Sequence, residues 1–361
     1  MQLKNFLFAL GRPFSPFYSS LMAIRALLYK QGILKSQKLV VPVISIGNLT
    51  MGGTGKTPMV VYISKLVHAM GLKPLVVSRG YGGLASDLVN IVSDGVKIRL
   101  SASQAGDEPR LLAESLPGVP VLTGKQRAVV GQYAVTHFKP EVIILDDGFQ
   151  HLALQRDIDL VLMRADSPFG NGHVFPGGDL REPMSALSRA HAFIVTGNEE
   201  KLDVPPELDE KTRNRRLPAR PLFLTSYRIV EIVDSKGNQP VLLEAVLKMP
   251  LYGFCGIANP QSFWISLQNE GFQIVGFKAF MDHHSYRLED FKQLAAQAMK
   301  NQAKALITTE KDLVKLRGMS VDFPVLVLRV ELTLDHTFQS FLKDKLQPLI
   351  CADNSVFVTK K

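Results

Sequence analysis

Short apolar runs alternate with segments of helical periodicity along most of the chain. The run at 39–48 ends at a glycine-rich stretch, and the helical pattern of 56–71 follows it. Further apolar runs occupy 73–83, 141–148, 157–165, 190–197 and 220–227, and 106–139 is mostly helical with a break at 117–124. Buried parallel strands are typically continuous apolar runs joined by helices. The pattern therefore predicts an α/β fold with a doubly wound, mostly parallel sheet.

The alternation pauses at 226–245 and then starts again. Residues 226–245 alternate and turn at 235–238, which predicts a hairpin linker. Beyond it, strands are predicted at 250–257, 272–280, 304–312 and 323–332, and helices at 259–271, 287–302 and 336–348. We therefore expect one domain over 36–225, a second, smaller α/β domain over 246–361, and a ligand site in the cleft between them.

Residues 1–35 have a different pattern. Apolar side chains recur there at helical spacing, and they are Phe14, Phe17, Tyr18, Leu21, Ile24 and Leu28. Arg25 and Lys30 lie elsewhere on the same helical wheel, and no acidic residue is present. Such a helix can lie in a membrane interface with its cations on anionic headgroups, or it can pack on its own domain. No apolar run approaches the roughly 20 residues that span a bilayer.

Composition and charge narrow the class of protein. The chain of 361 residues is long enough for two domains, and its hydrophobic (46%) and charged (21%) contents are typical of a folded cytosolic protein. Residues 1–86 carry +10 and no acidic residue, whereas the whole chain carries +9. This basic region indicates an anionic partner: phosphate, nucleic acid or lipid headgroups. The two distant cysteines, Cys255 and Cys351, exclude a thiolate metal site and indicate a reducing compartment.

The stretch NLTMGGTGKTPMV at 48–60 has the features of a phosphate-binding loop. Glycines allow backbone N–H groups to approach a phosphate, Lys56 supplies positive charge, and Thr57 supplies a hydroxyl for Mg²⁺. A strand precedes the loop and a helix follows it, as this kind of site requires. Thr50 replaces the first glycine of the usual pattern. We predict a nucleotide site formed by Thr50, Met51, Gly52, Gly53, Thr54, Gly55, Lys56 and Thr57.

A pair of carboxylates is predicted at the end of a neighbouring strand. The stretch VIILDDGFQH places Asp146 and Asp147 after an apolar run. Because consecutive strand residues point to opposite faces, only one of the two is expected to contact a metal directly. Together with Thr57, they form the predicted Mg²⁺ site.

Three kinds of phosphate chemistry are open to such a loop. A GTP-driven switch is poorly supported, because TTEKD at 308–312 puts Lys311 directly beside Asp312, in the wrong register for guanine. A partitioning-type ATPase fits the loop, but Met51 stands where its signature lysine is expected. A kinase needs a base for the acceptor hydroxyl, and Asp107 with Glu108, or the Asp282-His283-His284 group, could supply it.

A larger set of motifs resembles one family. The stretches SIGNLTMGGTGKTP, LVVSRGYGG, AGDEP, LDDGFQH, DLVLMRADSPFGNGHVFPGGDLREP, FCGIANPQSF, FMDHHSY and LITTEKDLVKL resemble, in order, the tetraacyldisaccharide 4′-kinases of lipid A synthesis. The resemblance implies a P-loop NTPase-like kinase. Its expected substrates are ATP, with Mg²⁺, and a tetraacylated glucosamine disaccharide 1-phosphate, which it converts to lipid IVA.

The resemblance also implies site residues. Asp107 is expected as the base, with His283 as its partner and Lys56 as the third catalytic residue. Positions tied to the substrate, nucleotide or metal are Asn48, Arg79, Tyr81, Glu108, Arg127, Gln150 and His151. Because the family's substrate sits in the inner membrane, the resemblance favours residues 1–35 as a monotopic anchor on the cytoplasmic face. We expect no nucleic-acid partner, because no basic platform with interleaved aromatic residues is present. No obligate protein partner is evident.

Overall fold

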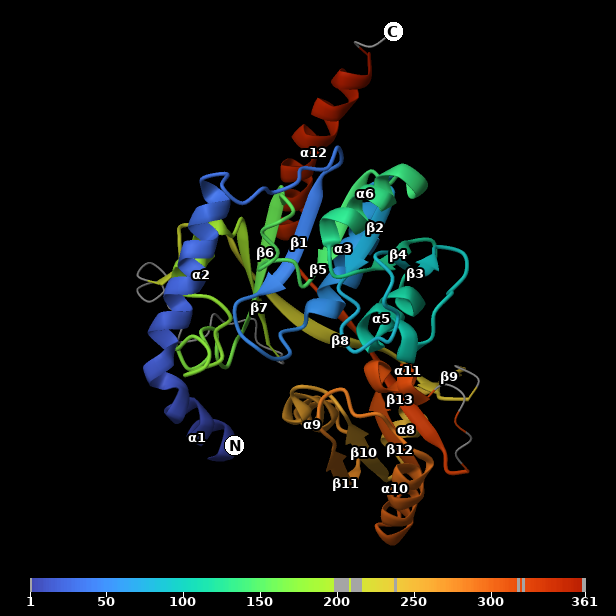
Figure 1. Cartoon of the computed structure of the whole chain (residues 1–361). Helices are drawn as coiled ribbons and strands as arrows, with labels where there is room; N and C mark the ends of the chain where they lie inside the picture. The colour runs from blue at the N-terminus through green and yellow to red at the C-terminus, as the bar shows by residue number, and fades with distance from the viewer. Residues whose placement is uncertain are drawn as a thin grey trace.

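A single continuous sheet runs through the computed structural model (Figure 1). The structure describes residues 2–197, 208, 216–236, 239–316, 319 and 322–358, with the backbone alone at 2–5 and 352–358. The strand order is β11-β10-β12-β13-β8-β7-β6-β1-β5-β2-β4-β3, and β9 pairs with β8 at its side. The α/β class predicted from the sequence is therefore confirmed.

The larger half of the sheet carries the apolar runs of the first part of the chain. Its strands are β1 (Val43–Asn48), β2 (Pro74–Ser78), β3 (Asn90–Asp94), β4 (Pro120–Thr123), β5 (Val142–Asp146), β6 (Ile158–Arg164) and β7 (Ala192–Thr196). All neighbouring pairs are parallel except β3–β4. The sequence pattern does not predict β3, and it indicates only an interruption between helices at β4. Both strands are short; β3 forms the sheet edge and β4 is its neighbour, where the apolar signal is weak.

Helices cover both faces of this half. They are α3 (Lys56–Ala69), α4 (Ala102–Ala105), α5 (Asp107–Ser115) and α6 (Arg127–Phe138). Alternate strand residues explain the two layers: Ile44 packs with Ile63 of α3, whereas Val43 packs with Val130 of α6. The 3₁₀ helix η2 (Met184–Arg189) and the loop that precedes it cover the remaining part of the second face.

Strand β8 (Leu222–Asp234) belongs to both halves of the sheet. Its first residues, Leu222 to Thr225, run parallel to β7, and the stretch from Ser226 onward runs antiparallel to β13 (Val325–Thr333). Strand β9 (Pro240–Val241) pairs antiparallel with β8, as the predicted hairpin requires, although Gly237 and Asn238 of its turn lie outside the described residues. The predicted linker is thus the end of a strand that the two halves share.

The smaller half repeats the α/β pattern. Its strands are β10 (Leu251–Cys255), β11 (Ile274–Ala279), β12 (Ala305–Thr309) and β13, which pair parallel with one another, whereas β13 pairs antiparallel with the shared strand β8. Its helices are α8 (Leu243–Leu247), α9 (Pro260–Asn269), α10 (Leu288–Lys300) and α11 (Glu310–Leu316).

The last helix lies against the larger half, not the smaller one. Helix α12 (His336–Val358) is longer than the predicted 336–348. The sequence pattern assigns it to the smaller domain, but Phe338, Leu342 and Leu346 are buried in the core that contains α3, so that boundary is corrected. The reason is that its apolar residues complete the α3 face of the larger half.

The N-terminal segment forms helices α1 (Gln2–Gly11) and α2 (Ser15–Lys30), joined by the 3₁₀ helix η1 (Arg12–Phe14). Figure 1 shows α2 along one flank of the larger half, with α1 leading away from it. Ser15 fastens α2 to the loop before η2, because its hydroxyl donates to Val174 O and accepts from Gly177 N. Among the described residues, no helix is both long and apolar enough to cross a membrane.

Candidate active site

The glycine loop joins the end of β1 to the start of α3, as predicted. Gly55 precedes α3 with a φ of 75°, and a Cβ there would lie 2.2 Å from the Tyr227 hydroxyl oxygen of β8. Only glycine fits this position, because both the backbone angle and the close contact exclude a side chain. The loop therefore brings its backbone amides and the N-terminus of α3 to one place, which suits an anion.

The structure explains why Thr50 can replace the first glycine. Thr50 is outside the positive-φ region, so its backbone does not require glycine. It is buried and pairs with Leu180, and the next residue, Met51, donates its N–H to Asp179 O. The glycine loop therefore packs against the segment before η2, and Thr50 contributes to this contact.

Lys56 lies among polar groups at the head of the loop. Its ammonium donates to Asn48 Oδ1 at 3.1 Å and lies 3.6 Å from Asp147 Oδ1. The Asn48 amide in turn donates to Thr50 O, and Gln150 Nε2 donates to Asn48 O. These contacts fix the position of the lysine before any phosphate binds.

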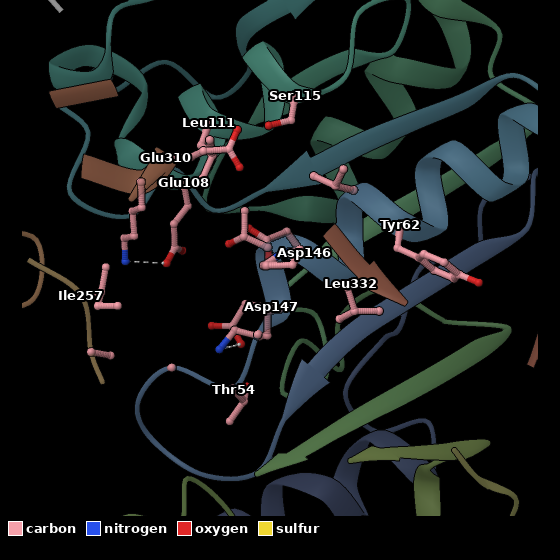
Figure 2. Close-up of a pocket in the computed structure, with 18 of the residues that line it drawn as sticks. Thr54, Tyr62, Glu108, Leu111, Ser115, Asp146, Asp147, Ile257, Glu310 and Leu332 are labelled. Atoms are coloured by element: carbon pink, nitrogen blue, oxygen red, sulfur yellow. Dashed lines mark hydrogen bonds and ion pairs between the residues drawn. The ribbon is translucent and has the colours of Figure 1, made fainter. Parts of the chain in front are cut away.

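Asp146 and Asp147 lie side by side but have opposite surroundings (Figure 2). Asp146 is buried, Ser78 donates to its Oδ2 at 2.9 Å, and its Oδ1 has no hydrogen-bond partner within the described part of the chain. Burial, followed by the nearby charges of Glu108 and Asp147, raises the pKa of Asp146 to about 7.

Asp147 is held by cations. Its carboxylate accepts two hydrogen bonds from Arg181, at 2.8 and 2.9 Å, in addition to the ion pair with Lys56. Burial opposes its ionisation, but Lys56, Arg181 and Arg127 outweigh burial and lower the pKa of Asp147. Arg181 is not among the predicted site residues, although it lies in a stretch that the family resemblance includes.

Asp107 and His283 come together from the two halves of the molecule. Asp107 begins α5 in the larger half, and His283 follows β11 in the smaller half; His283 Nδ1 lies 3.3 Å from Asp107 Oδ2. The ring of Tyr81 lies edge-on to His283, with 5.7 Å between the ring centroids. His283 has a φ of 59°, which is uncommon for a residue with a side chain and is typical of functional sites.

A second contact between the halves lies beside the first. Lys311 of α11 bridges Glu108 Oε1 and Asp282 Oδ1, each at 3.2 Å. In Figure 2, Glu108 and the loop at Thr54 lie apart along the cleft, with Asp146 and Asp147 between them. The sequence places Lys311 in the wrong register for guanine recognition and gives it no other role, so sequence reasoning missed its bridging position.

Buried Arg127 and partly buried His151 form a pair near the aspartates. Arg127 Nη1 lies 3.3 Å from His151 Nδ1, and its Nη2 donates to Asp147 O. Burial and then the neighbouring Arg127 lower the pKa of His151 to about 4, so the ring is neutral and Nδ1 accepts from the arginine. Arg25 of α2 donates to Gln150 O at 3.3 Å and so joins the N-terminal helix to this cluster.

A cleft of about 1810 Å³ collects these side chains. Most of the predicted site residues line it, namely Met51, Gly52, Gly53, Thr54, Gly55, Lys56, Thr57, Arg79, Tyr81, Glu108, Arg127, Asp146, Asp147, Gln150, His151 and His283. Asn48 and Asp107 stand behind this wall and contact Lys56 and His283, which form it, and Thr50 contacts Asn48. The structure therefore brings the predicted residues together at one place.

The residues present fit a divalent cation that also contacts phosphates. Among the described residues, no cluster of three or more His, Cys, Asp or Glu side chains could hold a metal alone. Mg²⁺ bound through a nucleotide needs only one or two carboxylates, and the buried Oδ1 of Asp146 without a partner is a suitable donor. Asp147 is less suitable, because Arg181 and Lys56 already occupy its carboxylate.

A phosphate loop on the end of β1, a carboxylate pair on β5 and an Asp–His pair across a cleft define a P-loop phosphotransferase. The sequence model of the family described as tetraacyldisaccharide-1-P 4′-kinase matches residues 7–347. The chain belongs to the tetraacyldisaccharide 4′-kinase family, and its activity is that of a lipid A 4′-kinase.

Curated relatives agree with this assignment. A tetraacyldisaccharide 4′-kinase of Desulfotalea psychrophila is 47% identical over 95% of this chain and 97% of its own length. One from Desulfatibacillum aliphaticivorans is 39% identical over 91% of this chain and 90% of its own length. A crystal structure of LpxK from Aquifex aeolicus in complex with ATP has a TM-score of 0.74 and 30% identity, and the match covers 94% of this chain and 98% of that one. Family membership decides against the GTP switch and the partitioning ATPase.

Proposed function

We propose that the enzyme transfers the γ-phosphate of ATP to the 4′-hydroxyl of a tetraacylated glucosamine disaccharide 1-phosphate, with Asp107 as the base, to give lipid IVA. The observation that supports these roles is the contact of Asp107 with His283 at the cleft that also contains Lys56 and Asp146. The phosphate loop and the candidate metal ligand line one cavity, and the base stands behind its wall in contact with His283, an arrangement that suits phosphoryl transfer.

In this mechanism the loop amides and Lys56 hold the β- and γ-phosphates. The 4′-oxygen attacks the γ-phosphorus in line; its bond to phosphorus forms as the bond to the β–γ bridging oxygen breaks, and ADP leaves. Asp107 accepts the hydroxyl proton. Its Oδ2 contacts His283, which leaves Oδ1 to receive that proton. His283 thereby keeps the carboxylate in its reactive orientation.

Asp146 and Thr57 would hold Mg²⁺, which supplies charge neutralisation at the phosphate oxygens when it is bound. Asp146 is favoured over Asp147 because its Oδ1 lacks a partner among the described residues. Asp147 then has a different role, since it joins Lys56 to Arg181 and keeps both cations at the phosphate end of the cleft. The acceptor side of this cleft is completed by Arg79, Arg127 and Tyr81.

We also propose that α1 and α2 dock the enzyme on the cytoplasmic face of the inner membrane. Large apolar side chains of these helices are exposed, and they are Phe6, Leu7, Leu10, Phe14, Phe17, Leu21, Ile24 and Leu27. We call this set the N-terminal apolar face. Exposed Arg12, Lys30 and Lys35 border it, which suits anionic headgroups. Arg25 joins the same helix to the cleft, so an acceptor with acyl chains in the leaflet would lie close to the phosphate site.

An acceptor panel tests the proposed reaction. Purified enzyme is incubated with ATP labelled at the γ-phosphate, with and without Mg²⁺, and with the acylated disaccharide 1-phosphate, its deacylated form or a phospholipid. Mg²⁺-dependent labelling of the acylated disaccharide alone is the expected result. Hydrolysis of ATP without labelled lipid would contradict the proposal.

A further inference from the structure

The carboxylate of Asp312 is completely buried in the smaller half, where an isolated charge is costly. It accepts hydrogen bonds from Gly256 N at 3.1 Å, from the Tyr286 hydroxyl at 2.9 Å and from the Thr309 hydroxyl at 2.8 Å. Its cation is Lys315, whose ammonium lies 2.9 Å away, one turn further along α11. These hydrogen bonds thus hold Asp312 in place, and Asp312 in turn fixes the position of Lys315.

Lys315 also faces the larger half of the molecule. Lys315 Nζ lies 3.9 Å from Asp107 Oδ2 and donates to Gly256 O at 3.4 Å. Asp312 and Gly256 O are close enough to accept hydrogen bonds from the ammonium, whereas Asp107 makes an ion pair with it at the longer distance. Only 6% of the Lys315 side chain is exposed, so solvent weakens its ion pairs little.

We infer that Lys315, held by Asp312, is a positioning residue that fixes Asp107 for proton transfer. Lys315 and His283 approach the same oxygen, Oδ2, from the smaller half. Together they hold that oxygen and direct Oδ1 to the acceptor hydroxyl. Because both partners belong to the smaller half, the base is in its reactive orientation only when the halves are in contact.

The inference rests on the proposed role of Asp107, and two pairs of variants separate the two claims. Lys315→Met is made in the wild-type enzyme and in Asp107→Ala. Lys292→Met is the matched control, since Lys292 is an exposed residue inside α10. Turnover, the KM for ATP and the melting temperature are measured for each protein.

In the wild-type background, we expect Lys315→Met to lower kcat by about tenfold to a hundredfold, the scale of a misplaced catalytic group, with an unchanged KM for ATP. In the Asp107→Ala background, the same change should cost nothing further, because the group it positions is gone. Lys315→Arg should recover part of the loss, since it restores the cation. Lys292→Met should behave like the wild type.

Two results would overturn the inference: normal turnover of Lys315→Met, or an equal loss in both backgrounds, which is the signature of a purely structural role. Asp312→Asn combined with Lys315→Met serves if the single variant does not fold, because the pair leaves no buried charge unpaired. Full activity of Asp107→Ala would instead contradict the proposed base.

Discussion

Asp107 and His283 are 176 positions apart in sequence, yet His283 Nδ1 and Asp107 Oδ2 are separated by only 3.3 Å. The contact closes one side of the cleft, with the larger half supplying the carboxylate and the smaller half the imidazole. The proposed base is therefore assembled from both halves, whereas the phosphate loop belongs to one. Nucleotide binding and proton removal should for this reason be separable by mutation.

Asp107→Ala tests that separation. It should leave ATP binding nearly unchanged and lower kcat by at least about a hundredfold, the usual lower scale for a lost general base. The measurements are nucleotide affinity by calorimetry and steady-state turnover on the acylated disaccharide 1-phosphate. Turnover close to that of the wild type would remove Asp107 from the role of base.

The two aspartates should respond in opposite ways to neutralisation. Asp146→Asn should raise the melting temperature at pH 8, because burial raises the pKa of Asp146 to about 7 and its ionised form is costly in the fold above that pH. Asp147→Asn should lower it, because cations lower the pKa of Asp147 and so favour its ionised form. Both should lose activity, Asp146→Asn by about a hundredfold or more if it holds the metal.

Calorimetric melting of the two variants at pH 8 provides the comparison. If Asp146→Asn melts below the wild type while Asp147→Asn does not, the assignment of the unpaired carboxylate to Asp146 is wrong. Titration with Mg²⁺ in the presence of ATP then distinguishes the metal ligand: a weaker apparent Mg²⁺ affinity is expected for Asp146→Asn.

The lowered pKa of His151 predicts that the stability of the fold depends on pH. Its pKa is about 4 in the fold and 6.5 in the unfolded chain, so the unfolded state binds the extra proton between these values. The stabilisation by neutral His151 is complete above about pH 6.5 and is lost as the pH falls towards 4. His151→Gln should therefore lose less stability than the wild type over this interval. Urea melts at pH 7 and pH 5 measure the loss of stability of each protein, and the comparison between the two proteins cancels the opposite contribution of Asp146. An identical loss in both proteins would contradict the neutral, partly buried histidine.

Gly55 offers a test of the loop geometry. Gly55→Ala should abolish ATP binding, because a Cβ would meet the Tyr227 hydroxyl at 2.2 Å. Gly71→Ala is the matched control: its φ is also positive, at 82°, but nothing lies within 4 Å, so it should cost only about 1 kcal/mol of stability. Tyr227→Phe should restore part of the binding of Gly55→Ala by removing the oxygen. No recovery, with an intact fold, would show that the backbone angle alone excludes alanine.

The N-terminal apolar face predicts lipid binding. Replacing Phe14, Phe17 and Leu21 with serine should weaken binding to phosphatidylglycerol vesicles by at least about tenfold, since each side chain loses apolar burial in the interface. Turnover on a water-soluble, short-chain acceptor should not change. Serine at Val96, Leu242 and Met299, which are exposed elsewhere, is the control. Equal vesicle binding by both triple variants would contradict the docking proposal.

Much of the architecture could be predicted because apolar runs and helical periodicity are strong signals in its buried parts. The strands at the centre of the sheet, the loop at Gly52–Gly55 and the Asp146–Asp147 pair all follow from local sequence. Short edge strands such as β3 carry little apolar signal. The packing of α12 on the larger half depends on contacts distant in sequence, which periodicity does not report.

The site shows the same limit. Lys56 and Thr57 are recognisable from the loop itself, but Arg181, Lys311 and Lys315 are ordinary basic residues until the fold places them against Asp147, Glu108 and Asp107. All three lie in stretches that the family resemblance includes, but only the tertiary contacts give each lysine or arginine its partner. The TTEKD stretch is in the wrong register for guanine recognition, and in the fold its aspartate is a buried anchor for Lys315.

The passage of β8 through both halves has a mechanical consequence. Because β8 pairs with β7 at one end and with β13 at the other, a movement of one half is transmitted to the other half. A flexible linker would not couple the two halves in this way. Cutting the chain within β8 would remove a hydrogen-bonded neighbouring strand from each fragment and leave an unpaired sheet edge. Neither piece is therefore an autonomous module, and the protein is best altered by substitution along its length instead of by dissection.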